Sequence, residues 1–157
     1  MSRHNKLLVA GIVLFCAIGF AADDPLNGTW KIDAPKSSFS NGKFPKNMSI
    51  TIKVTIQGNQ MIYYSVNDTN KDKPTGIDYT ATMDGKPYPA TGSDRYNTVS
   101  VRRLSPNQLE ILESKDGEVI VGALWEIFPG GKRFVRRGIA KGADGRSYEY
   151  EEFFDKQ

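Results

Sequence analysis

Period-two alternation of apolar and polar residues is the feature of this sequence that most constrains its fold. In its clearest stretch, 49–57, the residues Ile50, Ile52, Val54 and Ile56 alternate with polar ones. Successive side chains of a β-strand point to opposite faces, so the pattern places these four side chains on the buried face of a half-buried strand. Similar alternation recurs toward the end of the chain, while a helical period is scarcely seen. The sequence therefore predicts an all-β fold.

Turn signals divide the chain into nine expected strands. The first, Gly28–Asp33, stops at a Pro-containing turn, and Asp116-Gly117 is a strong hairpin dipeptide because both residues tolerate the left-handed backbone region. The other expected strands span 49–57, 61–67, 77–83, 96–104, 108–115, 118–128, 132–140 and 146–154. Residues 84–95 are rich in Pro and Gly and are expected to form a loop.

The turn after the strand 49–57 has two possible registers. A two-residue loop opposes Val54 with Tyr63 and turns Tyr64 to solvent, whereas a three-residue loop, 58–60, opposes Val54 with Tyr64. A one-residue slip moves every side chain of a strand to the other face. Because the three-residue loop turns more apolar side chains of the second strand inward, we expect that register.

Hairpin-connected strands with short turns predict an up-and-down antiparallel β-barrel of eight to ten strands. Closure of the sheet removes the exposed edges that would otherwise invite aggregation. Because consecutive antiparallel strands alternate in direction, a closed ring needs an even number of them. Two alternatives remain open. Either the strand at Trp30 closes on the strand 132–140, or a tenth strand lies within 35–46.

The alternation of strand direction also sorts the connections between strands. One end of the barrel is expected to carry 34–48, 67–75, 105–107 and 129–131, and the other 58–60, 84–95, 116–117 and 141–145. The first end has the longest connection, with Phe39, Phe44 and Met48 on it or beside it. We therefore expect the mouth of a ligand site at that end.

The first 21 residues have the organisation of a secretory signal peptide. A cationic start, Arg3–Lys6, precedes the uncharged and mostly apolar run 7–20, and Ala21 supplies the small residue before the cleavage site. We expect cleavage after Ala21, a secreted or periplasmic location, and one domain over 22–157. The apolar run is shorter than the roughly 20 residues of a membrane-spanning helix. No integral membrane association is expected after cleavage.

The expected domain, 22–157, contains neither Cys nor His, because Cys16 and His4 lie in the leader. It therefore has no disulfide and lacks the commonest general base and metal ligand. Arg3 and Lys6 account for two of the 21 basic residues, so 19 basic residues face 18 acidic ones. This balance disfavours a nucleic-acid partner, which requires concentrated positive charge. Without a catalytic or phosphate-binding motif, we predict no catalytic residues, metal or cofactor.

Gly28-Thr29-Trp30 at the head of the first expected strand resembles the G-x-W signature of the lipocalins and the wider calycin group. The resemblance implies a barrel whose closed end is plugged by Trp30, with Arg136 or Arg137 from a late strand packed across the indole. The chain has no T-D-Y-type motif, cysteine pair or C-terminal helix, so the expected barrel is lipocalin-like. The chain also resembles small exported bacterial proteins of uncharacterised function, in segments 84–92, 98–103, 115–117 and 154–157. This second resemblance brings no known activity with it.

Aromatic residues expected to face inward are the candidate ligand contacts. They are Phe39, Phe44, Tyr64, Tyr79, Tyr96, Trp125, Tyr148 and Tyr150. Aromatic rings offer large apolar surfaces, and tyrosine hydroxyls can orient a ligand through hydrogen bonds. The alternative is a core packed solid with these side chains, as in many small barrels. Both alternatives remain open.

The expected strand Val119–Phe128 is apolar on both faces, although a barrel wall needs only one apolar face. Either the connection 34–48 folds over its outer face, or this face is an interface. The protein is accordingly expected to be a monomer, or a dimer through Val119–Phe128.

The last hairpin brings arginines opposite glutamates: Arg133, Arg136 and Arg137 against Glu149, Glu151 and Glu152. Opposite charges on neighbouring strands stabilise a sheet by about 0.2–1 kcal/mol per pair. We expect structural pairing here rather than catalytic carboxylates. A two-residue turn at Asp144-Gly145 would set Arg137 against Glu152, and a tight turn at Gly130-Gly131 would set Arg136 opposite Trp125.

Together these expectations describe a secreted or periplasmic lipocalin-like protein that is not an enzyme. Its expected partner is a small apolar or amphipathic molecule bound in the barrel. The alternative is an exported protein-binding module, such as an enzyme inhibitor, whose barrel core is filled.

Overall fold

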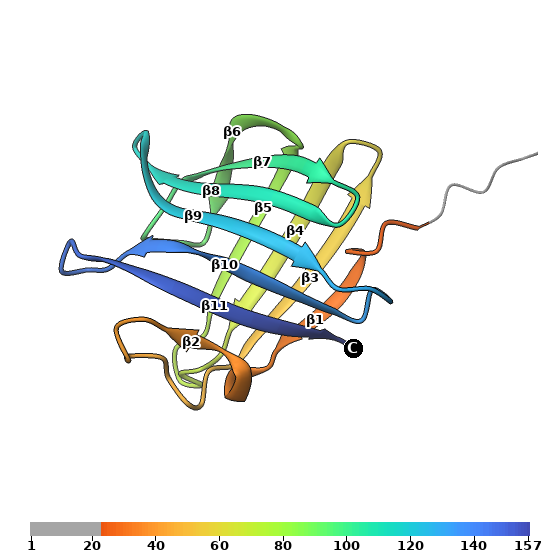
Figure 1. Ribbon diagram of the computed structural model, residues 1–157. Coiled ribbons are helices and arrows are strands. Elements are labelled where there is room, and N and C mark those ends of the chain that lie inside the picture. The colour runs from red at the N-terminus through yellow and green to blue at the C-terminus, as the bar shows by residue number, and fades with distance from the viewer. Residues whose placement is uncertain (1–22) are drawn as a thin grey trace, which may run out of the picture.

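The computed structural model describes residues 23–157 (Figure 1). The expected signal peptide, 1–21, lies outside the described residues, and its cleavage stays a prediction. The fold of 23–157 is all-β, as predicted, apart from the short 3-10 helix η1 (Ala34–Lys36). The strands are β1 (Gly28–Ile32), β2 (Ser38–Phe39), β3 (Ile50–Gln57), β4 (Gln60–Asn67), β5 (Thr75–Thr82), β6 (Asp84–Thr91), β7 (Thr98–Ser105), β8 (Gln108–Lys115), β9 (Glu118–Ile127), β10 (Arg133–Lys141) and β11 (Ser147–Lys156). In this part of the chain no helix has the length and apolarity needed to cross a membrane.

Ten of these strands close into an antiparallel barrel, which confirms the predicted architecture. Each strand from β3 to β11 pairs with the next, and β1 completes the ring between β3 and β11. Trp30 of β1 lies opposite Ile52 on one side and Lys156 on the other. In Figure 1, β8 to β11 cross in front of the wall that β3 to β5 form behind them.

Both expected ways of closing the ring are wrong. The partner that closes on β1 is β11, and the tenth strand is β6, in the segment expected to be a loop. Pro87 and Pro89 obscured this strand, because proline cannot donate a ladder hydrogen bond. The structure accommodates them because β6 aligns with β5 only at Thr91 and Ala90, and its register with β7 shifts between Asp84 and Pro87.

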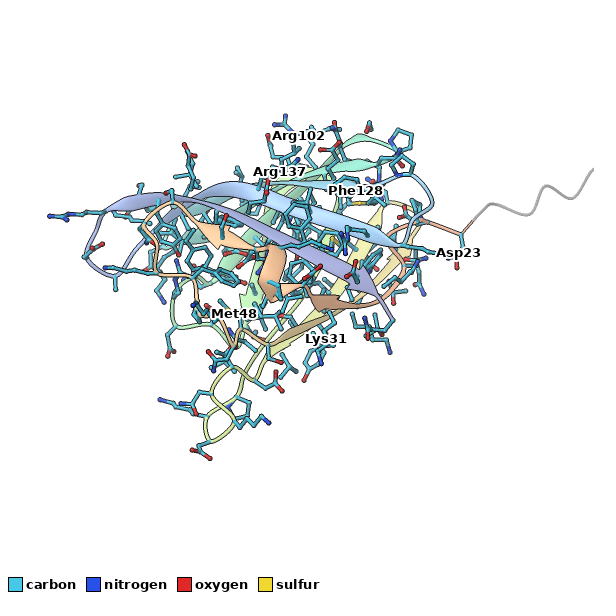
Figure 2. All side chains as sticks on the ribbon, turned by 60° about the horizontal axis from the view of Figure 1, so that its bottom comes forward. Asp23, Lys31, Met48, Arg102, Phe128 and Arg137 are labelled. Carbon is cyan, nitrogen blue, oxygen red and sulfur yellow. The ribbon has the colours of Figure 1, made fainter. Side chains whose placement is uncertain are left out.

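The additional strand changes which connections share an end of the barrel. One end, which we call the open end, carries the connections 33–49, 68–74, 92–97, 116–117 and 142–146. The other, the closed end, carries 23–27, 58–59, 83, 106–107 and 128–132. The placements expected for 105–107, 116–117, 129–131 and 141–145 are therefore wrong, because β6 reverses the direction of every strand after it. Figure 2 shows Met48 well separated from Asp23 and Phe128.

The hairpin of β3 and β4 has the two-residue loop, so the expected three-residue register is wrong. Val54 lies opposite Tyr63, and Gln57 opposite Gln60. The tight turn uses the left-handed region at Gly58, where φ is +59°. Tyr64 consequently points out of the barrel and is 51% exposed. Tyr63 instead points into the barrel, where its ring stacks on that of Tyr79.

The closed half of the barrel is packed solid around Trp30. This indole is fully buried, donates from Nε1 to the carbonyl oxygen of Leu26 at 2.8 Å, and meets Phe134 edge-to-face at 4.9 Å. The cation over the indole is Lys156, whose Nζ lies 5.1 Å from the ring centroid. The expected packing of Arg136 or Arg137 across Trp30 is therefore wrong. Arg136 lies over another ring, and Arg137 is on the outer surface.

The connection between β1 and β3 runs along β11. Ser37 and Ser40 accept hydrogen bonds through Oγ from the backbone N–H groups of Phe153 (3.0 Å) and Glu149 (2.9 Å), and β2 continues this pairing. The connection thus extends the seam begun by β1 (Figure 1). It packs against β11 and the open end rather than over the outer face of β9.

The outer face of β9 keeps part of its apolar surface accessible. Leu124 and Phe128 are half-buried and Val119 is 51% exposed, whereas Ile120 packs against the core. A dimer through Val119–Phe128 stays a prediction.

Arg137 pairs on the outside of the barrel with Glu151 and with Glu126, so the expected partner, Glu152, is wrong by one residue. The reason lies in the turn. The last hairpin turns through 142–146 rather than through two residues, which shifts the register. Figure 2 shows Arg137 on the outer side of the wall.

Candidate binding cavity

The open half of the barrel is hollow. A cavity of about 440 Å³ enters from the open end and reaches the middle of the barrel. Its lining residues are Phe39, Met48, Ile50, Tyr63, Ser65, Asn67, Thr75, Ile77, Gly92, Ser93, Asp94, Arg95, Tyr96, Glu113, Val121, Arg136, Ala140, Tyr148, Tyr150 and Glu152. The volume lies within the range of small-molecule sites in proteins. The barrel therefore combines the two expected alternatives, one half filled and one half hollow.

A layer of stacked aromatic rings separates the two halves. Tyr63 stacks on Tyr79 (4.5 Å between ring centroids) and reaches across the barrel to Trp125 (6.1 Å). Trp125 stacks on Phe134 (4.9 Å), and Phe134 on Phe154 (4.8 Å). Because each ring is held by at least one other, this layer is a firm base for the cavity.

An ion pair lies inside the wall, immediately above this layer. Arg136 lies opposite Trp125 on β9, as predicted, and opposite Glu152 on β11. The two ionic side chains bond to each other and are only 17% and 6% exposed. The guanidinium also lies 5.0 Å from the Phe154 ring centroid. Burial acts to lower the pKa of Arg136, but Glu152 and nearby tyrosines outweigh it, so the pKa is raised and Arg136 remains charged.

Glu113 provides a second inward carboxylate, from β8. It lies in register between Val99 and Val121, whose side chains are both buried inside the barrel. Burial raises the pKa of Glu113, although Arg136 and Arg95 act in the opposite direction. Tyr96 lines the same cavity and also acts to lower the pKa of Glu113. No ion pair of residues 23–157 within 4.0 Å includes Glu113.

Tyrosine hydroxyls supply the remaining polar groups deep in the barrel. Burial raises the pKa of Tyr63, Tyr79, Tyr96 and Tyr150 above the ordinary value. These groups consequently stay protonated at neutral pH, so each can donate as well as accept a hydrogen bond. The rim at the open end is mixed, with the apolar Phe39 and Met48 and the polar Ser93, Asp94 and Arg95.

The structure brings together four of the eight aromatic residues predicted as ligand contacts. Phe39, Tyr96, Tyr148 and Tyr150 line the cavity. Phe44 packs against Phe39 at 4.9 Å, outside the lining. Tyr79 and Trp125 lie in the aromatic layer below, and Tyr64 faces out, which corrects its expected inward position. Whether the lining residues bind a ligand stays a prediction.

Polar residues of the cavity were missed, although the alternation that predicts the strands also points to them. Inward Leu109 and Ile111 set the parity that turns Glu113 inward. Phe134 does the same for Arg136 on β10, and Phe154 for Glu152 on β11. The sequence interpretation treated Arg136 and Glu152 only as members of cross-strand ion pairs on the surface, so it did not predict that they line the cavity.

The cavity offers shape, hydrogen bonds and fixed charges. Within residues 23–157 no group of three or more His, Cys, Asp or Glu side chains is arranged to hold a metal ion. The side chains that are present can enclose a small molecule, orient its polar end and exclude water from its apolar part.

Comparison with solved structures supports the fold. The chain is similar to zebrafish ileal bile-acid-binding protein, solved in complex with cholic acid, with a TM-score of 0.53 and 15% sequence identity. The alignment covers 85% of this chain and 99% of the zebrafish protein. No protein-family model and no curated protein sequence matches the chain. This likeness shows the fold alone, a closed antiparallel β-barrel, which is the kind of fold that the G-x-W resemblance implied.

Proposed function

We propose that this protein binds a small amphipathic molecule in the open half of its barrel, without catalysing a reaction. The observation that carries the proposal is the 440 Å³ cavity, whose lining combines apolar and aromatic side chains with tyrosine hydroxyls and charged groups. A ligand with one apolar and one polar part matches this mixed lining, because each part can then meet groups of its own kind.

Two further observations support the proposal. The zebrafish protein of similar fold was solved with cholic acid, a small molecule with polar and apolar parts. The segment 22–157 of this chain contains no His or Cys, the side chains most often used as general bases and nucleophiles at neutral pH. A secreted or periplasmic location, from the signal-like residues 1–21, is part of the same proposal.

The proposal is tested by placing a larger side chain in the wall of the cavity. Val121 is buried in the lining, whereas Val119 on the same strand is 51% exposed. Val121→Phe should weaken binding of a neutral fluorescent probe, N-phenyl-1-naphthylamine, by about tenfold or more, the cost of losing roughly 1.4 kcal/mol of contacts. Val119→Phe, the same substitution outside the cavity, should leave the affinity unchanged.

Fluorescence titration of both variants, after circular dichroism has confirmed their folding, gives the answer. Probe binding that is equally strong in both variants would place the site elsewhere, and no probe binding by the wild type would remove the main support for a ligand carrier.

The second candidate is a protein-binding module. It is favoured by an outer groove of about 530 Å³ beside β2, lined by Ser38, Ser40, Arg137, Gly138, Ile139, Glu149, Tyr150 and Glu151. Among the large apolar side chains of residues 23–157, that of Ile139 is the most exposed, at 56%. A protein partner bound there should be insensitive to Val121→Phe and lost in Ile139→Asp, which separates the two candidates.

A further inference from the structure

The cavity carries more negative than positive charge. Its ionisable lining residues are the acids Asp94, Glu113 and Glu152 and the bases Arg95 and Arg136. Both bases already have partners. Arg136 is paired with Glu152, and Arg95 donates from Nη2 to the carbonyl oxygen of Lys141 at 3.0 Å. The cavity therefore holds a net excess of one carboxylate over its guanidinium groups.

Glu113 is the acid whose environment points to a ligand. It lies in register between two buried valines, lines the cavity together with Tyr96, and has no cation within 4.0 Å among residues 23–157. A carboxylate removed from water is costly unless a positive charge or several donors accompany it. The Arg136 guanidinium does not fully meet this need, because Glu152 is bonded to it.

Building on the proposed function, we propose that the ligand is an amphipathic amine whose protonated nitrogen lies against the carboxylate of Glu113. Its apolar part would extend toward Phe39 and Met48 at the rim. Tyr96, which lines the same cavity, would offer its hydroxyl to the polar group that surrounds the ammonium.

An acidic ligand suits this cavity less well. Its carboxylate would approach Glu113 and Glu152 while competing with Glu152 for Arg136, and like charges in a shielded site repel strongly. Burial raises the pKa of Glu113 even with Arg136 and Arg95 nearby, which fits a site whose negative charge the protein leaves partly uncompensated. The expected head group is therefore opposite in charge to that of the cholic acid in the zebrafish structure.

The test compares three ligands that share one chain and differ in the head group: dodecylammonium, dodecanol and dodecanoate. Each displaces the neutral naphthylamine probe from the purified protein at neutral pH, below the concentration at which it forms micelles. Dodecylammonium should bind about tenfold more tightly than dodecanoate, the scale of one charge-assisted hydrogen bond. Glu113→Gln, which keeps the shape of the side chain and removes its charge, should abolish that preference.

The matched control is Glu110→Gln on the same strand. Glu110 faces outward and pairs with Arg102, so its neutralisation should leave the order of the three ligands unchanged. Thermal unfolding of each variant confirms that it is folded. If Glu113→Gln does not fold, the order of the three ligands in the wild type decides the matter.

Three results would overturn the inference. They are tighter binding of dodecanoate than of dodecylammonium, equal binding of all three ligands, or a preference for the amine that survives Glu113→Gln. In each of these cases, probe binding that Val121→Phe still weakens would leave the proposed function standing. If neither the probe nor any of the three ligands binds, both proposals fail.

Discussion

Arg136 and Glu152 bring two opposite charges into the interior of a barrel wall, where each depends on the other. Removing two ions from water costs several kcal/mol per ion, and a buried pair offsets this cost only while both members are present. The pair is therefore the point at which a single substitution of a charged residue should affect stability most.

Arg136→Met should lower the free energy of unfolding by about 3–5 kcal/mol, because Glu152 then remains buried without its cation. The double variant Arg136→Met/Glu152→Leu should recover most of the loss. Arg137→Met is the control, since its pairs with Glu126 and Glu151 are exposed and such pairs contribute at most about 1 kcal/mol. Urea denaturation measures all three, and equal effects of the two single variants would show that water reaches the inner pair.

Glu113 should make the unliganded protein less stable as the pH rises. Its pKa is raised in the folded state above the ordinary 4.5, so the unfolded chain releases the proton first. Stability from this group is therefore fully present below about pH 4.5 and is lost as the pH rises through the folded pKa. The charged and titratable groups that face it are Arg136, Arg95, Glu152 and Tyr96.

The measurement is the difference in unfolding free energy between the wild type and Glu113→Gln across this range. Taking a difference cancels the acids with lowered pKa values, such as Asp155, whose contribution has the opposite sign. The wild type should lose stability relative to the variant as the pH increases. A difference that does not change with pH would mean that the carboxyl group is well solvated.

The residue scale also shows what sequence reasoning could and could not reach at the site. Tyr148 and Tyr150 were predicted because they share one face of the last strand, whereas Tyr96, also predicted, lies in the connection before β7. Tyr64 was chosen in place of Tyr63 because counting apolar residues favoured the wrong register by one position. A second argument bears on the choice of register, namely that a ligand cavity needs polar groups in its interior. This argument cannot be applied until the cavity is known.

At the level of elements, β10 approaches β9 closely at Gly138. A Cβ atom on Gly138 would lie 2.0 Å from the carbonyl oxygen of Gly122, whereas a Cβ on Gly122 would meet only the Leu112 Cδ2 atom at 3.6 Å. The two strands can keep their spacing with alanine on one side but not on the other.

Gly138→Ala should therefore destabilise the protein by about 1–3 kcal/mol, the usual cost of overpacking a site that cannot relax. Gly122→Ala, on the facing strand, should change stability much less. Thermal unfolding of both variants checks the asymmetry. If the two variants melt at the same temperature, the backbones of β9 and β10 can separate without cost.

Element prediction failed at β6 for a physical reason. Its prolines and glycines are the residues that normally end strands, and only a short, irregular pairing with both neighbours tolerates them. Whether these residues are tolerated depends on the neighbouring strands, so the local sequence of β6 does not reveal it. The nine strands with ordinary alternation were predicted in their correct order, with differences of a few residues at their ends.

At the scale of the whole molecule, the closed barrel was predictable because alternation and short turns leave few other ways to bury one face of every strand. The side that opens to solvent could also be recognised from the long connection with Phe39. The closing pair could not, since it depends on a strand count that one overlooked strand changes from odd to even.

The seam between β1 and β11 joins positions more than a hundred residues apart, such as Trp30 and Lys156. Contacts this remote in sequence carry a large entropic cost and tend to form slowly. While the chain is still being synthesised, the strands up to β10 cannot form a closed ring, because β11 has not yet been made. The sheet can therefore close into a ring only once β11 is available, and we expect the β1–β11 seam to be among the last contacts to form.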